Sequence, residues 1–226
     1  MWQKRRIITY QEIAAIPTGE NKESLVDVCH YDPNIIARYE KNDMLLYTGK
    51  RIFVRDTVAR KLATANKSLT KNSKFRLRVA YGYRHPDIQK KYFEQKRTEL
   101  RVSRPSLTDG ELDALTHNFI AVPSVAGHPT GGAVDVTIVD AAGKELDMGT
   151  KIADFKNAER IKTFAKGLSN KQKRNRLLLH DILVREGFAP FYGEWWHFSY
   201  GDREWACFYG KLKSIYSPLK FEVRKK

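Results

Sequence analysis

The first segment of this 226-residue chain that could do chemistry contains His128 and Asp135. His128 lies in a glycine-rich stretch, and Asp135 follows seven residues later inside the apolar run 133–139. Burying a carboxylate in such a strand costs several kcal/mol unless a partner compensates it. A divalent cation held by both residues would do so. The alternative is structural: Asp135 pairs with an arginine or accepts backbone hydrogen bonds, while His128 packs in a loop.

The second segment is Glu194-Trp195-Trp196-His197. Residues three apart on a strand point to opposite faces of the sheet. Glu194 can therefore approach a ligand of His197 only if Glu194 lies in the turn before the strand or at a bulge. Tyr192-Gly193 predicts such a turn. Taken alone, the segment favours a structural interpretation, in which the tryptophans fill the core while Glu194 and His197 lie at the surface.

Together the two segments predict a catalytic metal site. His128, Asp135 and His197 form the three-ligand set, with one open position, that is typical of catalytic zinc, although other divalent metals use the same ligands. Glu194, a carboxylate that is not a ligand, would act as the base for the metal's water. Arg84, just past a predicted strand, could stabilise an oxyanion, or it could form a surface salt bridge. The remaining histidines have no metal-like spacing and are interpreted as structural: His30, His85, His117 and His180.

Hydrophobic periodicity predicts the elements that must position these residues. It predicts an α+β fold with strands in the interior and helices covering one side. Residues 1–50 are expected to be irregular, with turns at 32–33 and 48–50. Helices are predicted at 53–65, 86–101, 106–119 and 171–186, and strands at 75–81, 133–139, 188–191 and 195–200. No linker or repeat divides the sequence, so we expect a single domain over residues 1–226 with its core at about 20–200.

Composition limits the classes of partner. The formal net charge of +15 would suit a nucleic-acid-binding protein, but the basic residues are spread along the chain. The densest cluster, 171–176, begins a predicted helix and is read as a solvated helical face, so no nucleic-acid partner is expected. No stretch reaches the ~20 apolar residues of a membrane span. The N-terminal apolar runs are too short for a signal peptide, and a soluble, cytoplasmic protein is expected.

The motifs resemble the zinc signature of the D-alanyl-D-alanine dipeptidases, a group of D,D-peptidases in peptidase family M15. The similarity extends to Gly82-Tyr83-Arg84, to Asp147-Met148-Gly149-Thr150 and to the helix at 170–187 that leads into Phe188, in the family's order over about residues 20–200. The resemblance implies a small α+β domain with a largely antiparallel sheet. It also implies one Zn²⁺, a small D,D-dipeptide substrate, and the roles given above for the five site residues. The oligomeric state remains open.

Two departures from the family pattern concern specificity. Ala126 stands where the dipeptidases usually have a serine, two residues before the first zinc histidine. Ala153 stands where they commonly have an aspartate that helps to hold the substrate's free amine, and Asp154 comes one residue late. A D,D-carboxypeptidase acting on longer peptidoglycan peptides is therefore an alternative to the dipeptidase. A second alternative is a basic binding module that keeps the fold and has lost catalysis.

Overall fold

The computed structural model describes residues 5–223, so the outermost residues of the expected domain, 1–4 and 224–226, lie outside the described part. The prediction of an α+β fold is confirmed. The helices are α1 Tyr10–Ala14, α2 Leu45–Thr48, α3 Asp56–Ser73, α4 Pro86–Ser103, α5 Asp109–His117, α6 Ala158–Ile161, α7 Asn170–Arg185 and α8 Arg203–Phe208, with short 3-10 turns η1 His128–Thr130 and η2 Phe155–Asn157. The strands are β1 Leu25–Asp27, β2 Ile36–Ala37, β3 Phe53–Arg55, β4 Arg76–Tyr81, β5 Ala133–Val139, β6 Ala189–Pro190 and β7 His197–Ser199.

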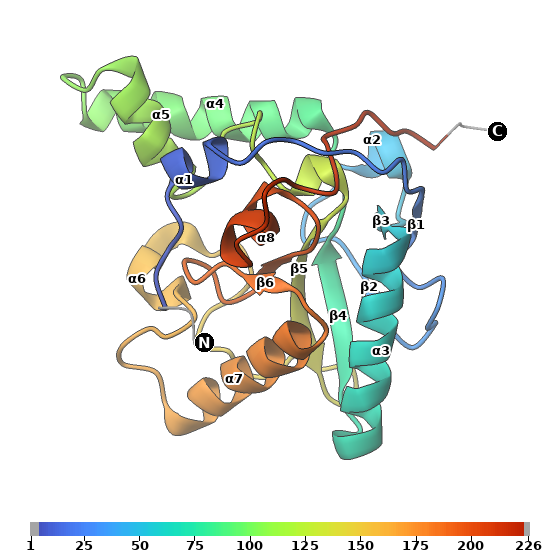
Figure 1. Ribbon diagram of the computed structural model, residues 1–226. Coiled ribbons are helices and arrows are strands. Elements are labelled where there is room, and N and C mark those ends of the chain that lie inside the picture. The colour runs from blue at the N-terminus through green and yellow to red at the C-terminus, as the bar shows by residue number, and fades with distance from the viewer. Residues whose placement is uncertain (1–4, 224–226) are drawn as a thin grey trace.

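The central sheet has five strands in the order β2-β4-β5-β7-β6 (Figure 1). Only β2 and β4 pair in parallel, while the other three pairs are antiparallel, as the resemblance implied. β1 and β3 form a separate antiparallel pair. β4 ends, and β5 begins, at the end of the sheet that lies beneath α4 (Figure 1). Asp135 and Arg84, two of the site residues predicted from the sequence, belong to this end of the sheet.

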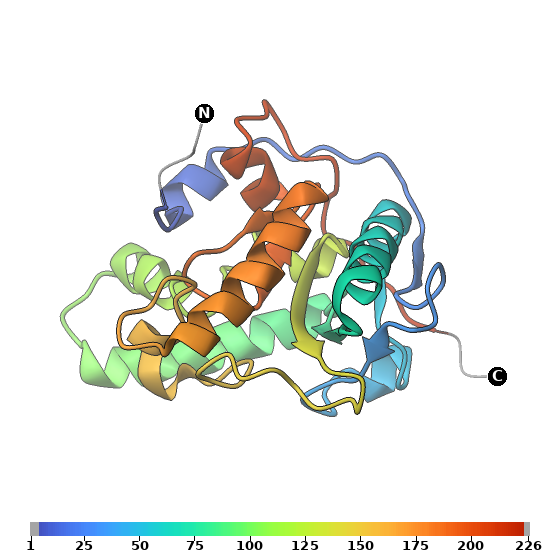
Figure 2. The ribbon, with the colours of Figure 1, turned by 90° about the horizontal axis from the view of Figure 1, so that it is seen from below.

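Helices α3 and α7 lie side by side against one face of the sheet (Figure 2). Every residue of β5 is buried, and alternate residues point to opposite faces. Val134, Val136 and Ile138 join the main core with apolar residues of α3 and α7. Asp135 and Thr137 therefore belong to the opposite face. This core draws residues from Val28 to Tyr216, and on this ground we propose that the chain forms one domain.

Several element boundaries differ from the sequence prediction. Phe53–Arg55 is a strand rather than the start of a helix, because it pairs with β1. The helix begins at Asp56 and continues to Ser73, where Lys74 adopts a left-handed conformation and ends it. Residues 5–50 contain short elements that contribute to both sheets. None of the described helices is long and apolar enough to cross a membrane.

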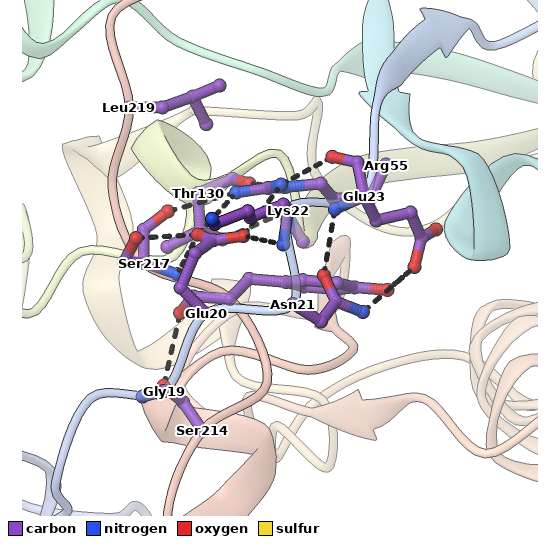
Figure 3. Close-up of polar contacts among 12 residues, drawn as sticks. Gly19, Glu20, Asn21, Lys22, Glu23, Arg55, Thr130, Ser214, Ser217 and Leu219 are labelled. Atoms are coloured by element: carbon purple, nitrogen blue, oxygen red, sulfur yellow. Dashed lines mark hydrogen bonds and ion pairs between the residues drawn. The ribbon is translucent and has the colours of Figure 1, made fainter.

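Arg55 ties both ends of the described chain to the turn that carries His128 (Figure 3). Its side chain is buried, and its Nε donates to the carbonyl oxygen of Thr130 at 2.7 Å. Its guanidinium also donates to Glu20 at 3.0 Å and to the carbonyl oxygen of Ser217 at 3.2 Å. The hydroxyl of Ser217 in turn donates to Glu20 at 2.6 Å. One arginine therefore fixes an N-terminal segment, a C-terminal segment and the His128 turn.

Replacing Arg55 should destabilise the protein strongly. We expect Arg55→Met to lower the free energy of unfolding by about 3 kcal/mol, because buried carbonyl groups and Glu20 lose their donor. Urea denaturation measures this. The control is Arg60→Met, which breaks an exposed pair with Asp56 and should cost about 0.5 kcal/mol or less. Equal effects of the two substitutions would contradict the assigned role of Arg55.

Candidate metal centre

The register of the sheet brings Asp135 and His197 together. Asp135 in β5 lies directly opposite His197 in β7, and Tyr81 in β4 lies opposite Asp135 on its other side. His197 Nδ1 lies 3.0 Å from Asp135 Oδ1. Residues 62 positions apart in the sequence are thus neighbours because of strand pairing alone.

The end of β4 holds the turn that carries His128. His128 Nδ1 lies 2.8 Å from the carbonyl oxygen of Gly82, to which it donates when that nitrogen carries the proton. The backbone N–H of Arg84 donates to the carbonyl oxygen of His128 at 3.2 Å. Gly131 ends the turn in a left-handed conformation with φ 73°. With Nδ1 engaged by a carbonyl group, Nε2 of His128 is free to bind a ligand, and it faces Asp135 Oδ2 at 3.4 Å.

Gly127 is required at its position by close packing rather than by its backbone angles. Its φ and ψ of −75° and −40° suit any residue. A Cβ atom there would overlap Asp202 Oδ2 and approach the side chain of Ala133. Asp202 in turn caps α8 by accepting from the backbone N–H of Trp205 at 2.8 Å. The His128 turn is therefore packed tightly against the start of α8.

His128, Asp135 and His197 form a group that could hold a metal ion. Each offers one ligand atom, and these atoms all lie within 4.8 Å of one another. Among residues 5–223 this is the only group of three such side chains close enough to share an ion. Two imidazoles and one carboxylate are the donor set that zinc prefers when one position stays open for water or substrate. The three residues named from the sequence are thus brought together.

Arg84 lies beside this group. Its Nη2 is 3.7 Å from Asp135 Oδ2, and its Nη1 donates to Gln89 Oε1 at 2.9 Å. The guanidinium carbon lies 4.6 Å from the centre of the Tyr81 ring. The Nε atom of Arg84 is buried and has no hydrogen-bond partner among the described residues. The side chain of Arg84 is only 12% exposed, so its contact with Asp135 is a buried ion pair rather than a surface salt bridge.

Glu194 lies in the turn before β7, where its side chain can face the same cavity as His197. Its backbone N–H donates to the carbonyl oxygen of Phe191 at 3.1 Å, and its own carbonyl oxygen accepts from the N–H of His197 at 3.3 Å. The prediction that Glu194 belongs to a turn is confirmed. Trp195 and Trp196 also belong to this turn rather than to a strand, and both are buried in the main core.

The electrostatics of the cluster favour a cation. Burial raises the pKa of Glu194 to about 8, with Asp135 and Glu204 acting in the same direction. Burial also raises the pKa of Glu204. Burial alone would lower the pKa of His197, but its contact with Asp135 and the nearby carboxylates raise it to about 9. When both imidazoles are neutral and the carboxylates are ionised, as cation binding requires, the negative charge of Asp135, Glu194 and Glu204 exceeds the positive charge of Arg84. A divalent cation would compensate this excess and replace the protons that the raised pKa values indicate.

A cavity of about 290 Å³ opens onto the cluster. At its inner end it is lined by the three candidate ligands, Arg84, Glu194 and Glu204. It continues along α4, whose Gln89, Tyr92, Lys96 and Glu99 contribute to the wall. Ala126 and Ala153 also line it. Asp154 is not part of the lining and instead caps η2 through the backbone N–H of Lys156.

Sequence reasoning missed two residues of the site, Glu204 and Gln89. Glu204 follows the signature by seven residues on a short helix, and no spacing rule marks it. Gln89 is buried and bridges Arg84 to the carbonyl oxygen of Ala121 at 2.8 Å, a contact that depends on the path of a distant loop. His117 lines the cavity, but its Nδ1 accepts from the backbone N–H of Val122 at 3.2 Å, so it acts as a structural residue.

Comparison with known proteins identifies the family. The sequence profile described as "D-ala-D-ala dipeptidase" (Peptidase M15) matches residues 24–215. A D-alanyl-D-alanine dipeptidase of Synechocystis sp. is 37% identical over 107 residues, which are 43% of this chain and 43% of that protein. The Escherichia coli enzyme of the same name is 37% identical over 73 residues, 32% of this chain and 37% of that protein. The matched segments therefore span less than half the length of these relatives.

Among solved structures, the LdcB LD-carboxypeptidase aligns with a TM-score of 0.47 and 19% identity, covering 81% of this chain and 71% of that chain. VanYB in complex with D-alanine-D-alanine aligns with a TM-score of 0.43 and 18% identity, covering 71% of this chain and 80% of that chain. The family profile covers most of the chain, including all five predicted site residues. The chain therefore belongs to the D-Ala-D-Ala dipeptidase family.

Proposed function

We propose that this protein is a zinc peptidase that hydrolyses D-Ala-D-Ala to free D-alanine, with His128, Asp135 and His197 as the zinc ligands. The observation that carries the proposal is the convergence of these ligand atoms within 4.8 Å at the inner end of a cavity. A fourth group, Glu194, lines the same cavity without belonging to the ligand set. Membership of the dipeptidase family supports the dipeptide as substrate.

Glu194 would act as the general base. Zinc, when bound, lowers the pKa of a coordinated water to ~7 and polarises the substrate carbonyl group. Glu194 takes a proton from the attacking water as the oxygen adds to the carbonyl carbon. It then gives this proton to the amine nitrogen as the C–N bond breaks. Two hydrogen bonds fix its backbone in the turn before His197, and its side chain lines the cavity that contains the candidate ligands.

Arg84 would stabilise the oxyanion that develops on the carbonyl oxygen. Arg84 lines the cavity beside the candidate ligands, and its guanidinium would provide a charge-assisted donor there. Gln89 holds one end of the guanidinium, and the ring of Tyr81 supports its face. These contacts orient the arginine before the substrate arrives.

Replacing Glu194 should separate metal binding from hydrolysis. Glu194→Gln removes the base but no ligand, so zinc should bind with near-normal stoichiometry while kcat falls by roughly 10²–10⁴-fold. D-Alanine release and bound zinc are measured on the same preparation. Glu159→Gln, which alters an exposed glutamate, is the control. Near-normal turnover in Glu194→Gln would remove the assigned role.

A second candidate is a D,D-carboxypeptidase that acts on longer peptides, and the cavity along α4 favours it. From Gln89 to Glu99 the helix rises about 15 Å, whereas an extended dipeptide spans about 7 Å. Ala153 lies in the cavity wall where the resemblance implies an aspartate for the substrate's amine, and Asp154 does not replace it. The site therefore has room for additional residues and lacks this anchor for a free amine.

A substrate panel distinguishes the two candidates. We expect release of D-alanine from D-Ala-D-Ala that a chelator abolishes, and none from L-Ala-L-Ala. Rates are compared with those for a pentapeptide that ends in D-Ala-D-Ala. A higher kcat/KM for the pentapeptide would establish the carboxypeptidase instead. A protein that cleaves neither substrate but binds polyanions in a salt-sensitive way would be the non-catalytic module.

The cytoplasmic location expected from the sequence stays a prediction.

A further inference from the structure

The two candidate histidine ligands differ in what holds their second nitrogen. For His128 this is the backbone carbonyl group of Gly82, 2.8 Å from Nδ1. His197 turns Nδ1 toward Asp135 at 3.0 Å, and its Nε2 points the other way, 3.9 Å from Glu204 Oε2. A metal ion bound by all three ligands must lie on the Asp135 side of the His197 ring. Nδ1 is then the ligand atom, and Nε2 carries the proton.

Glu204 is placed to receive that proton's hydrogen bond. It lies in the first turn of α8, and its side chain is only 14% exposed. Its Oε1 is buried without a hydrogen-bond partner within residues 5–223. α8 is anchored by the Asp202 cap, which itself packs against Gly127. The carboxylate therefore stands on a fixed helix behind His197.

We propose that Glu204 is a positioning residue that accepts a hydrogen bond from His197 Nε2 and so fixes this ligand's tautomer and ring orientation. Carboxylates in this position raise the basicity of a ligand histidine, and their loss commonly weakens metal binding by 10–100-fold. The distance of 3.9 Å between His197 Nε2 and Glu204 Oε2 is longer than a hydrogen bond. We expect it to shorten when the metal is bound. The inference rests on the proposed role of His197 as a ligand.

Zinc affinity tests the inference without relying on activity. We expect Glu204→Ala to bind zinc 10–100-fold more weakly than the parent protein in a competition with a chromophoric chelator. Glu204→Gln keeps an acceptor oxygen and should lose less. Arg203→Ala is the matched control, because it alters the neighbouring residue of the same helix, whose side chain contacts Thr18 instead of the site. It should bind zinc as the parent does.

A second measurement observes the hydrogen bond itself. In ¹H–¹⁵N spectra of the zinc-loaded protein, the Nε2 proton of His197 should be protected from exchange, and this protection should be lost in Glu204→Ala. If the parent protein binds no zinc, the proposed function fails. If the parent binds zinc and both Glu204 variants bind it equally well, only the role of Glu204 fails. An unchanged zinc affinity with a raised KM for D-Ala-D-Ala would overturn the inference by assigning Glu204 to the substrate's amine.

Discussion

The structure depends on a carboxylate placed in the middle of a buried strand. Asp135 is 5% exposed and belongs to a strand in which every residue is buried. An apolar residue at this position would make the folded protein more stable unless the charge of Asp135 is compensated. Here two histidines and an arginine surround it, each supplied by a different segment of the chain. The geometry of the site follows from the need to satisfy this one group.

The surroundings of Asp135 explain several features that have no catalytic role of their own. The β4–β5–β7 register places His197 opposite Asp135. The His128 turn is closed by Gly131, packed through Gly127 and tied down by Arg55, which also links the two ends of the described chain. α8 brings Glu204 behind His197. The strand register, the His128 turn and α8 thus all help to hold His128 and His197 at fixed positions.

The sequence named the residues that the structure brings together at the candidate site, whereas several elements of the fold around them have other bounds than predicted. Asp135 in an apolar strand signals an uncompensated charge, and Glu194 in a turn before His197 follows from local turn chemistry. The prediction of a helix over Phe53–Arg55 is wrong because Val54 has the helical spacing of four with Val58 and Leu62, and only pairing with β1 reveals the strand. Glu204 and Gln89 were missed because their roles depend on tertiary contacts that no local spacing encodes.

The most direct test of the central claim is the position of the metal in a zinc-loaded crystal. Anomalous scattering at the zinc edge should show one strong peak, with His128 Nε2, an oxygen of Asp135 and His197 Nδ1 at about 2.0–2.2 Å. A peak at another site, or coordination that excludes Asp135, would contradict the account of this buried carboxylate as a metal ligand.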